Sequence, residues 1–249
     1  MIGIPIDLHP EFPTNANLIL LTECAQADPG LLAKIKGQLT AGKTVVITSG
    51  LLRALQDKGL QDIVEARCTD RKILAQQYSG GFGAGNFAAL DGGTNRDILF
   101  PQIDFLTNDA WSLVRAEAGG NAFPLLLMDR YARGVLYLWT LPENFGDLYA
   151  LPPEVLGAIK NYVLRGFPVR VDGPSQIALF AYDNNTFIVE SFLPGETDVK
   201  ISVPGDFTRL KNLSTGEIIA GQSPKQSVRG RPEAGTAAVG FGVHLPPHS

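Results

Sequence analysis

The sequence contains little of what most enzymatic sites require. Of 249 residues only three are histidine and two are cysteine, and no histidine lies between His9 and His244. A serine or cysteine nucleophile needs a general base, most often histidine, so acyl-transfer chemistry lacks its base through the middle of the chain. Cys24 and Cys68 stand in unlike contexts and form no disulfide framework. This cysteine usage favours a reducing compartment and predicts a cytoplasmic protein.

Charge and hydrophobic length argue against two further classes. The formal net charge is -4 and the basic residues are scattered, so no nucleic-acid partner is expected. No apolar run approaches the ~20 residues of a membrane helix, and residues 1–6 lack the features of a signal peptide, so no membrane partner is expected. Hydrophobic residues make up 45% of the chain and charged residues 18%, which indicates a globular protein with a sizeable core.

The sequence predicts neither a metal nor a cofactor. Asp7, His9 and Glu11 alternate in an extended segment, which places three metal-capable side chains on one face. With no second cluster of ligands, hydrated loop charges are the favoured interpretation. The glycine-dense residues 80–85 lack the spacing of a dinucleotide-binding loop and the Lys-Ser/Thr pair of a phosphate loop, so they are interpreted as a flexible loop.

The stretch from 18 to 55 has the pattern of a parallel β-α-β unit. Residues 18–21 form an apolar run, and Asp28 with Pro29 predicts a capped helix start. Gly42 ends the helix, and residues 45–47 predict the second strand. The apolar side chains that recur at helical spacing between these strands are Leu31, Leu32, Ile35 and Leu39.

After this unit the pattern predicts further strands and one helix. Apolar pairs at 63–64 and 73–74 predict short strands, and residues 98–106 and 111–116 predict longer ones. Residues 125–128 and 135–139 predict an antiparallel hairpin near a sheet edge. The other expected segments are a loop over 80–94 and a helix that starts at Pro152 and is closed by Gly166.

The period changes after Gly166. Seven short apolar segments follow, separated by turn clusters such as residues 183–185 and 214–216 and with no helix between them. Short strands at this spacing predict a β-sandwich. The expected organisation is an α/β domain over residues 1–168 and a small all-β sandwich over 169–249. The chain stops directly after a predicted strand, which leaves open that it is a segment of a longer protein.

Three residues of the β-α-β unit are candidates for chemistry or for lining a cleft. Ser49 stands where a strand passes into a helix, which is the position of a nucleophile elbow, but only Gly50 of the usual glycines is present. Its alternative role as a helix cap is favoured. Cys24 is a second nucleophile candidate, and burial as a small hydrophobe is favoured for it. Glu23 is a candidate for lining a cleft at the carboxyl edge of the sheet.

A carboxylate pair follows the last strand of the first domain. Glu143 and Asp147 could serve as the acid and base of glycoside hydrolysis, although loop carboxylates are common without any chemistry. Trp139, Tyr149 and Tyr182 could stack on a sugar ring, and core packing explains each of them as well. The weak candidate pocket therefore consists of Glu23, Ser49, Glu143 and Asp147, with no residue assigned as catalytic.

Residues 17–166 resemble the class I glutamine-amidotransferase-like fold, a flavodoxin-like three-layer sandwich. The resemblance is carried by residues 18–21, 31–39, 42–50 and 133–138. It is most similar to the non-catalytic version in glycoside hydrolases related to beta-galactosidases with a trimerisation domain. Residues 176–249 are similar to the β-sandwich that trails it in those proteins. The Gly-x-Cys-x-Gly elbow of active amidotransferases is missing here.

This resemblance implies a non-catalytic, carbohydrate-associated segment of a glycoside hydrolase. Its expected partners are an upstream catalytic barrel, a carbohydrate and further copies of the same chain, and its expected roles are subunit contact, shaping of an active site or sugar binding. An independent enzyme or small-ligand binder with a pocket near Glu23, Ser49 and Glu143 is the alternative. A pure assembly module without sugar affinity is a third interpretation.

Overall fold

The computed structural model describes residues 1–81, 90–106, 110–222 and 238–249. The chain divides into two compact units. One unit is Leu8–Leu151, called here the α/β unit. The other combines Met1–Asp7 with Pro152–Ser249 and is called the sandwich unit. The expected boundary between residues 168 and 169 stays a prediction.

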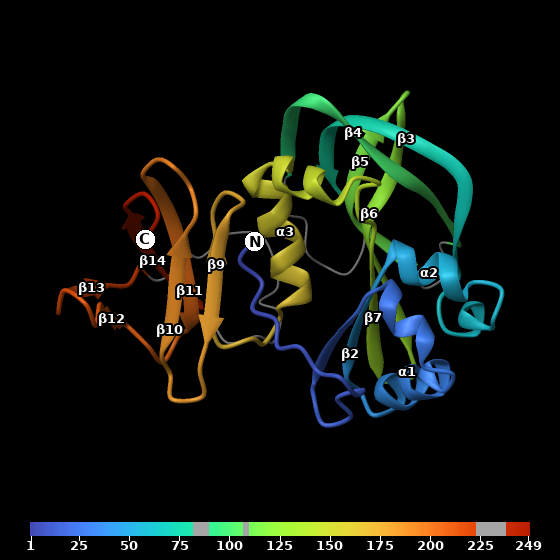
Figure 1. Ribbon diagram of the computed structural model, residues 1–249, viewed down its shortest axis with the longest axis horizontal. Coiled ribbons are helices and arrows are strands. Elements are labelled where there is room, and N and C mark those ends of the chain that lie inside the picture. The colour runs from blue at the N-terminus through green and yellow to red at the C-terminus, as the bar shows by residue number, and fades with distance from the viewer. Residues whose placement is uncertain (82–89, 107–109, 223–237) are drawn as a thin grey trace, which may run out of the picture. The chain divides into compact units, whose positions relative to one another are not determined.

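The α/β unit is built on a seven-stranded mixed sheet (Figure 1). Its order is β1-β2-β7-β6-β5-β3-β4, in which β1, β2 and β7 are parallel and the remaining pairings are antiparallel. The strands are β1 Leu18–Leu21, β2 Thr44–Thr48, β3 Ala66–Gly80, β4 Asp91–Phe105, β5 Ala110–Ala118, β6 Asn121–Tyr131 and β7 Gly134–Trp139.

Two helices cover one face of this sheet. Helix α1 spans Leu31–Thr40 and helix α2 spans Ser49–Leu55. Their buried side chains join sheet residues such as Ile47 and Leu138 in one apolar cluster. Side chains of the opposite sheet face, such as Val46, are buried as well. A sheet buried on both faces explains the near-continuous apolar runs of its central strands. Three short 3-10 helices complete the unit: η1 Glu23–Ala27, η2 Leu60–Asp62 and η3 Phe145–Ala150.

The β-α-β prediction is confirmed, with one correction at the helix start. Gly30, not Asp28, is the N-cap residue, and Asp28 Oδ1 instead accepts a hydrogen bond from the Gly30 N–H at 2.9 Å. Asp28 therefore stabilises the turn before the helix. Gly42 closes α1 as predicted, with a φ of +82° that glycine adopts at little cost.

The predicted hairpin forms, but its predicted place near a sheet edge is wrong. Strands β6 and β7 pair around a turn at Ala132 and lie in the middle of the sheet, because β7 also pairs with the parallel strand β2. Residues 125–128 are fully buried, as a central strand requires. Residues 129–134, predicted as a turn, are instead the ends of the two strands with a short turn at Ala132 and Arg133 between them.

Strands β3 and β4 are much longer than the sequence pattern predicts. Each has 15 residues, so the predicted strand at 73–74 is a small part of β3, and residues 91–94 belong to β4 instead of a loop. Residues 82–89 of the predicted loop lie outside the described residues. The predicted strand at Ile63 and Val64 is wrong. These side chains are buried at the end of η2, where an apolar pair fills the core without strand pairing.

The described residues of the sandwich unit form one helix and seven short strands. Helix α3, Pro153–Val163, begins as predicted with a proline in its first turn. The strands form three small sheets, in the orders β14-β11-β8, β10-β9 and β12-β13. All seven predicted strands are confirmed: β8 Arg170–Asp172, β9 Ile177–Ala181, β10 Phe187–Ser191, β11 Thr197–Pro204, β12 Arg209–Lys211, β13 Ile218–Ala220 and β14 Ala238–Leu245. Their inner faces share one apolar cluster. No helix among the described residues is long and apolar enough to span a bilayer.

Candidate functional site

Ser49 lies at the carboxyl edge of the parallel strands, where its hydroxyl group is engaged in a structural hydrogen bond. Its side chain is buried, and its Oγ accepts a hydrogen bond from the Leu141 N–H at 3.1 Å. The predicted role of Ser49 as the helix cap is wrong by one residue. Thr48 is the N-cap of α2, and its side chain accepts from the Leu51 N–H at 3.4 Å. Ser49 thus links the segments that follow β2 and β7.

The two cysteines have opposite environments. Cys68 on β3 is buried, and its thiol donates to the Ser49 carbonyl at 3.4 Å. Burial raises the pKa of the Cys68 thiol, while Arg53 acts in the opposite direction. A thiol with a raised pKa is a poor nucleophile. The predicted burial of Cys24 is wrong: it is exposed because residues 23–27 form a 3-10 helix with no buried residue.

Glu23 lies beside the first turn of α2. A Cβ placed on Gly50 would lie 3.0 Å from Glu23 Oε2 and 3.3 Å from Glu23 Cβ. The missing side chain of Gly50 is therefore what allows Glu23 to approach. The structure thus brings Glu23 close to the helix start that contains Ser49. Glu23 itself remains exposed.

Glu143 is held between two cations. Its Oε1 lies 3.3 Å from Arg53 Nη2 on α2, and its Oε2 lies 2.7 Å from Lys72 Nζ on β3. The backbone N–H of Glu143 donates to the Leu99 carbonyl on β4 at 2.9 Å. The hydrogen bond from Lys72 lowers the pKa of the Glu143 carboxyl, burial opposes this effect and Arg53 adds to it. A general acid of a glycosidase needs a raised pKa, so Glu143 is unsuited to that role at neutral pH.

Asp147 belongs to a second ion pair on the same segment. Its Oδ1 lies 2.7 Å from Arg96 Nη2 on β4, and its side chain is only 14% exposed. Asn144, between the two carboxylates, caps η3 by accepting the Gly146 N–H at 3.1 Å. The segment 143–147 is therefore fixed at both ends by contacts to β3, β4 and α2.

Together these contacts show that β3 and β4 pass over the carboxyl edge of β2 and β7 (Figure 1). In open α/β sheets this edge is where ligands bind. Here polar contacts between protein groups occupy it. No sequence pattern marks Arg53, Lys72 and Arg96 as partners of the carboxylates, because they are isolated cations far apart in the chain. Only the fold of β3 and β4 brings them to the carboxylates.

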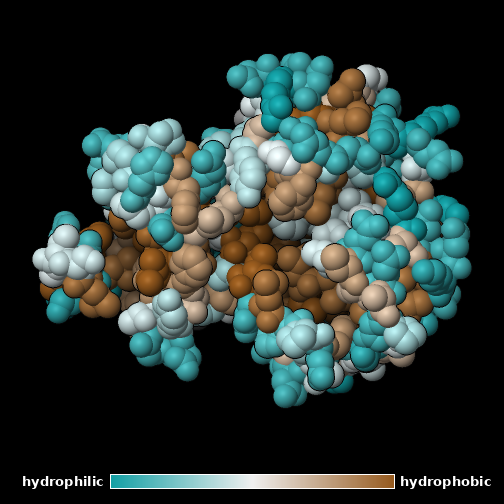
Figure 2. Space-filling model, viewed as in Figure 1, coloured by the Kyte–Doolittle hydropathy of each residue, from teal (hydrophilic) through white to brown (hydrophobic). Residues whose placement is uncertain are grey.

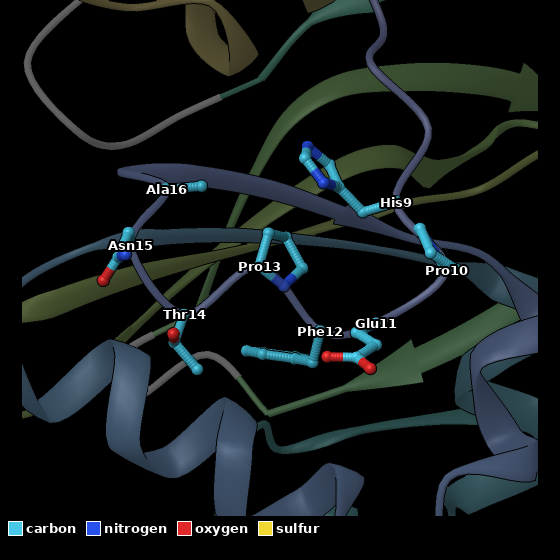
Figure 3. A pocket seen from close by; sticks show the side chains of 8 residues that line it. All are labelled: His9, Pro10, Glu11, Phe12, Pro13, Thr14, Asn15 and Ala16. Carbon is cyan, nitrogen blue, oxygen red and sulfur yellow. The ribbon is translucent and has the colours of Figure 1, made fainter.

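A separate hollow lies at the opposite edge of the sheet. Residues 9–16, which lead into β1, surround an open space of about 570 Å³ (Figure 3). Thr14 anchors this loop, since its carbonyl accepts from Gln38 Nε2 at 2.9 Å and from Lys43 Nζ at 2.6 Å. His9 and Glu11 point to different sides of the loop (Figure 3). None of the four candidate residues lines this hollow, and no group of three metal-capable side chains occurs in the part of the chain that the structure describes.

Solved structures that resemble the chain include two glycoside hydrolases. The beta-galactosidase from Bacillus circulans sp. alkalophilus matches with 12% identity and a TM-score of 0.45, over 92% of this chain and 34% of that one. Alpha-L-fucosidase isoenzyme 2 from Paenibacillus thiaminolyticus matches with 15% identity and a TM-score of 0.43, over 96% of this chain and 41% of that one. The chain thus spans about a third of the length of the beta-galactosidase.

A third structure is the cytoplasmic protein STM1381 from Salmonella typhimurium LT2. It matches with 14% identity and a TM-score of 0.41, over 59% of this chain and 67% of that one. No curated protein matches the sequence.

Two family models cover most of the sequence. Residues 168–249 match the family described as "Probable glycosyl hydrolase, C-terminal domain". Residues 1–144 match the family described as "Uncharacterized protein SSO3021, second domain". Because the second match covers more than half of the 249 residues, the chain belongs to the family of the SSO3021 second domain.

Proposed function

We propose that this chain is a non-catalytic part of a glycoside hydrolase, where it serves in subunit contact, in shaping an active site or in sugar binding. Its association with glycoside hydrolases is supported by the family match of residues 168–249. The non-catalytic character is carried by one observation: Glu143 is neutralised by Arg53 and Lys72. A carboxylate held in this way stays ionised, so it is unsuited to donate the proton that glycoside hydrolysis requires.

The proposal includes an amidotransferase-like α/β domain. It is supported by the parallel strands β1, β2 and β7 with α1 and α2 on one face of the sheet. It also includes a domain boundary near residue 168, an upstream catalytic barrel, self-association and a cytoplasmic location. The start of the C-terminal family match at residue 168 supports this boundary.

The test is an activity assay with a matched pair of variants. The chain, Glu143→Gln and Glu117→Gln are incubated with aryl β-galactosides, β-glucosides and α-fucosides, and release of the aryl alcohol is measured. We expect no turnover above buffer for any of the three proteins. Glu117 is an exposed carboxylate on β5 and serves as the control.

Turnover that Glu143→Gln abolishes and Glu117→Gln preserves would show instead that the chain is an enzyme. The site of that enzyme would then include the cluster near Glu23, Ser49 and Glu143. The positive part of the proposal is tested on the complete reading frame that encodes this chain. If that reading frame also encodes a catalytic barrel, deleting the segment that encodes residues 1–249 is expected to lower the glycosidase activity or the assembly state of the longer protein, and unchanged values of both would contradict the proposal.

A further inference from the structure

The two-stranded sheet β9-β10 has one face in the core, and its other face is exposed at Phe180, Tyr182 and Ile188 but covered at Ala178. The pairs Leu179 with Val189 and Ile177 with Ser191 lie opposite one another in the ladder. Ile177 and Leu179 belong to the apolar cluster of the sandwich unit, and Val189 packs against it. Because side chains alternate along a strand, the residues between them point the other way.

The outward face carries large apolar side chains that folding leaves exposed. Phe180 and Ile188 lie directly opposite one another and are 46% and 51% exposed. The backbone N–H of Tyr182 donates to the Thr186 carbonyl at 3.0 Å, so the pairing of the two strands extends to Tyr182 and its side chain lies on the same face as Phe180. Tyr182 is 52% exposed. Together the three side chains form a small contiguous apolar surface on this face. Figure 2 shows apolar surface in the region of β9 and β10.

Polar groups border these rings on the same face. Glu190 lies opposite Ala178 in the ladder, and Thr186 pairs with Tyr182 at the other end. Over roughly 13 Å of strand, this face therefore presents aromatic rings next to a carboxylate and hydroxyl groups. An aromatic ring offers a flat apolar surface, and the neighbouring oxygens accept or donate hydrogen bonds. This combination suits the apolar ring faces and the hydroxyls of a pyranose.

The size of the face argues against a second protein chain as its occupant. Two strands with their side chains make a surface roughly 13 Å by 10 Å. A stable dimer buries at least ~600 Å² on each partner, several times this area. A short oligosaccharide is of matching size.

We propose that the outward face of β9-β10 binds a neutral oligosaccharide, with Phe180 and Tyr182 as the stacking surfaces and Glu190 and Thr186 as hydrogen-bonding groups. The inference deepens the proposed function and rests on it, because it assigns the sugar-binding role to one surface. It needs no catalysis by this chain.

The test uses calorimetric titration of the full chain with β-1,4-linked galactotetraose, cellotetraose and mannotetraose. We expect at least one of these probes to bind. Phe180→Ala and Tyr182→Ala are each expected to weaken that binding about tenfold, the effect of removing an aromatic anchor from a small interface. Leu213→Ala is the matched control, since Leu213 is 76% exposed on the same unit but lies outside this face. Circular dichroism of each variant verifies the fold.

Three results would overturn the inference. The first is that none of the probes binds at millimolar concentration. The second is that a probe binds to Phe180→Ala and to Tyr182→Ala as tightly as it binds to the unchanged chain. The third is sedimentation of a dimer that Phe180→Ala dissociates, because the face would then belong to a second copy of the chain. Hydrolysis of a bound probe would contradict the proposed function and leave the assigned binding surface intact.

Discussion

Both units bury a charged side chain, Asp129 in the α/β unit and Lys160 in the sandwich unit, and both leave large apolar side chains exposed, but they surround their charges differently. In the α/β unit the charged candidates Glu143 and Asp147 are paired with cations at the rim of the sheet, and apolar side chains fill both faces. In the sandwich unit Lys160 on α3 is only 2% exposed, while Phe180 and Ile188 stand in solvent. Buried charge and exposed apolar surface both oppose stability. The difference lies in the partners of the charges: the rim carboxylates of the α/β unit are paired with cations, whereas Lys160 of the sandwich unit donates to a backbone carbonyl.

Lys160 illustrates how the sandwich unit tolerates a buried cation. Its Nζ donates a hydrogen bond to the Val171 carbonyl. Gly3, from the first residues of the chain, lies so close that a Cβ there would be 3.3 Å from that Nζ. Burial lowers the pKa of Lys160, and the charge of Asp172 acts in the opposite direction. The amine is thus enclosed by both pieces of the unit.

The largest expected effect contrasts two isoleucines. Ile47 on β2 is fully buried, so Ile47→Ala should lower the free energy of unfolding of the α/β unit by about 3 kcal/mol. Ile188→Ala on the exposed face of β10 should change stability by less than about 1 kcal/mol. Urea unfolding followed by tryptophan fluorescence reports the first change, because Trp111 and Trp139 both lie in the α/β unit. Far-ultraviolet circular dichroism reports the second. Equal losses would remove the contrast between the units.

A second prediction concerns the pH dependence that Lys160 gives to the sandwich unit. Its folded pKa is lower than the ordinary value of 10.5, so the unfolded chain binds more protons between these two values. Stability should therefore rise with pH in that window and level off above 10.5. Lys160→Met should remove this rise, and Lys211→Met, an exposed control on β12, should keep it. Urea unfolding at several pH values between 7 and 10.5 measures the slopes, and identical slopes in all three proteins would refute the assignment.

A smaller effect is expected at the ion pairs of Glu143. Glu143→Gln should lower the free energy of unfolding by about 1 kcal/mol, because two half-exposed cations lose their partner. The pKa of Glu143 is lowered in the folded state, so its contribution is present above the ordinary value of 4.5 and is lost as the pH falls through the folded value. Tryptophan fluorescence in urea at pH 7 and below 4.5 measures both points. Glu117→Gln is the control, and an equal loss in it would argue against a role for the pairs.

The smallest effect is expected at an exposed histidine of the sandwich unit. His244 Nδ1 lies 3.0 Å from Asp198 Oδ1, and its Nε2 lies 3.5 Å from Glu196 Oε2. The hydrogen bond with Asp198, more than the charge of Glu196, raises the pKa of His244. The small stabilisation it supplies is present below the ordinary value of 6.5 and is lost as the pH rises through the folded value. Nuclear magnetic resonance titration of the ring should show a lower pKa in Asp198→Asn, and no change would contradict the pairing.

The sequence predicts what local periodicity encodes. The β-α-β unit and the seven strands of the sandwich unit depend on runs of neighbouring residues, and both are confirmed. The length of β3 and β4 depends on pairing between segments that carry many charged and polar residues, such as 66–72 and 93–97, so no apolar pattern marks it. The edge position expected for β6 and β7 failed for a similar reason, because the neighbours of a strand are set by the whole sheet.

The candidate site shows the same limit. Its carboxylates and Ser49 could be selected by residue type and by their place after a strand. Their partners Arg53, Lys72 and Arg96 could not, since each lies 51 or more positions away in the chain from the carboxylate that it pairs with. The pKa of Glu143 follows from those partners and not from its own neighbours in sequence. The chemical properties of the carboxylates therefore depend on the tertiary positions of α2, β3 and β4, which the sequence pattern does not encode.

The division of the chain also has a consequence for its cohesion. Because Met1–Asp7 and Pro152–Ser249 form one unit, the backbone passes between the units twice, once after Asp7 and once after Leu151. A single protease cut at either crossing leaves the two halves joined by the other. During translation, residues 8–151 are synthesised before the last 98 residues of the chain. Residues 1–7 can therefore pack with residues 152–249 only after the whole α/β unit has been synthesised.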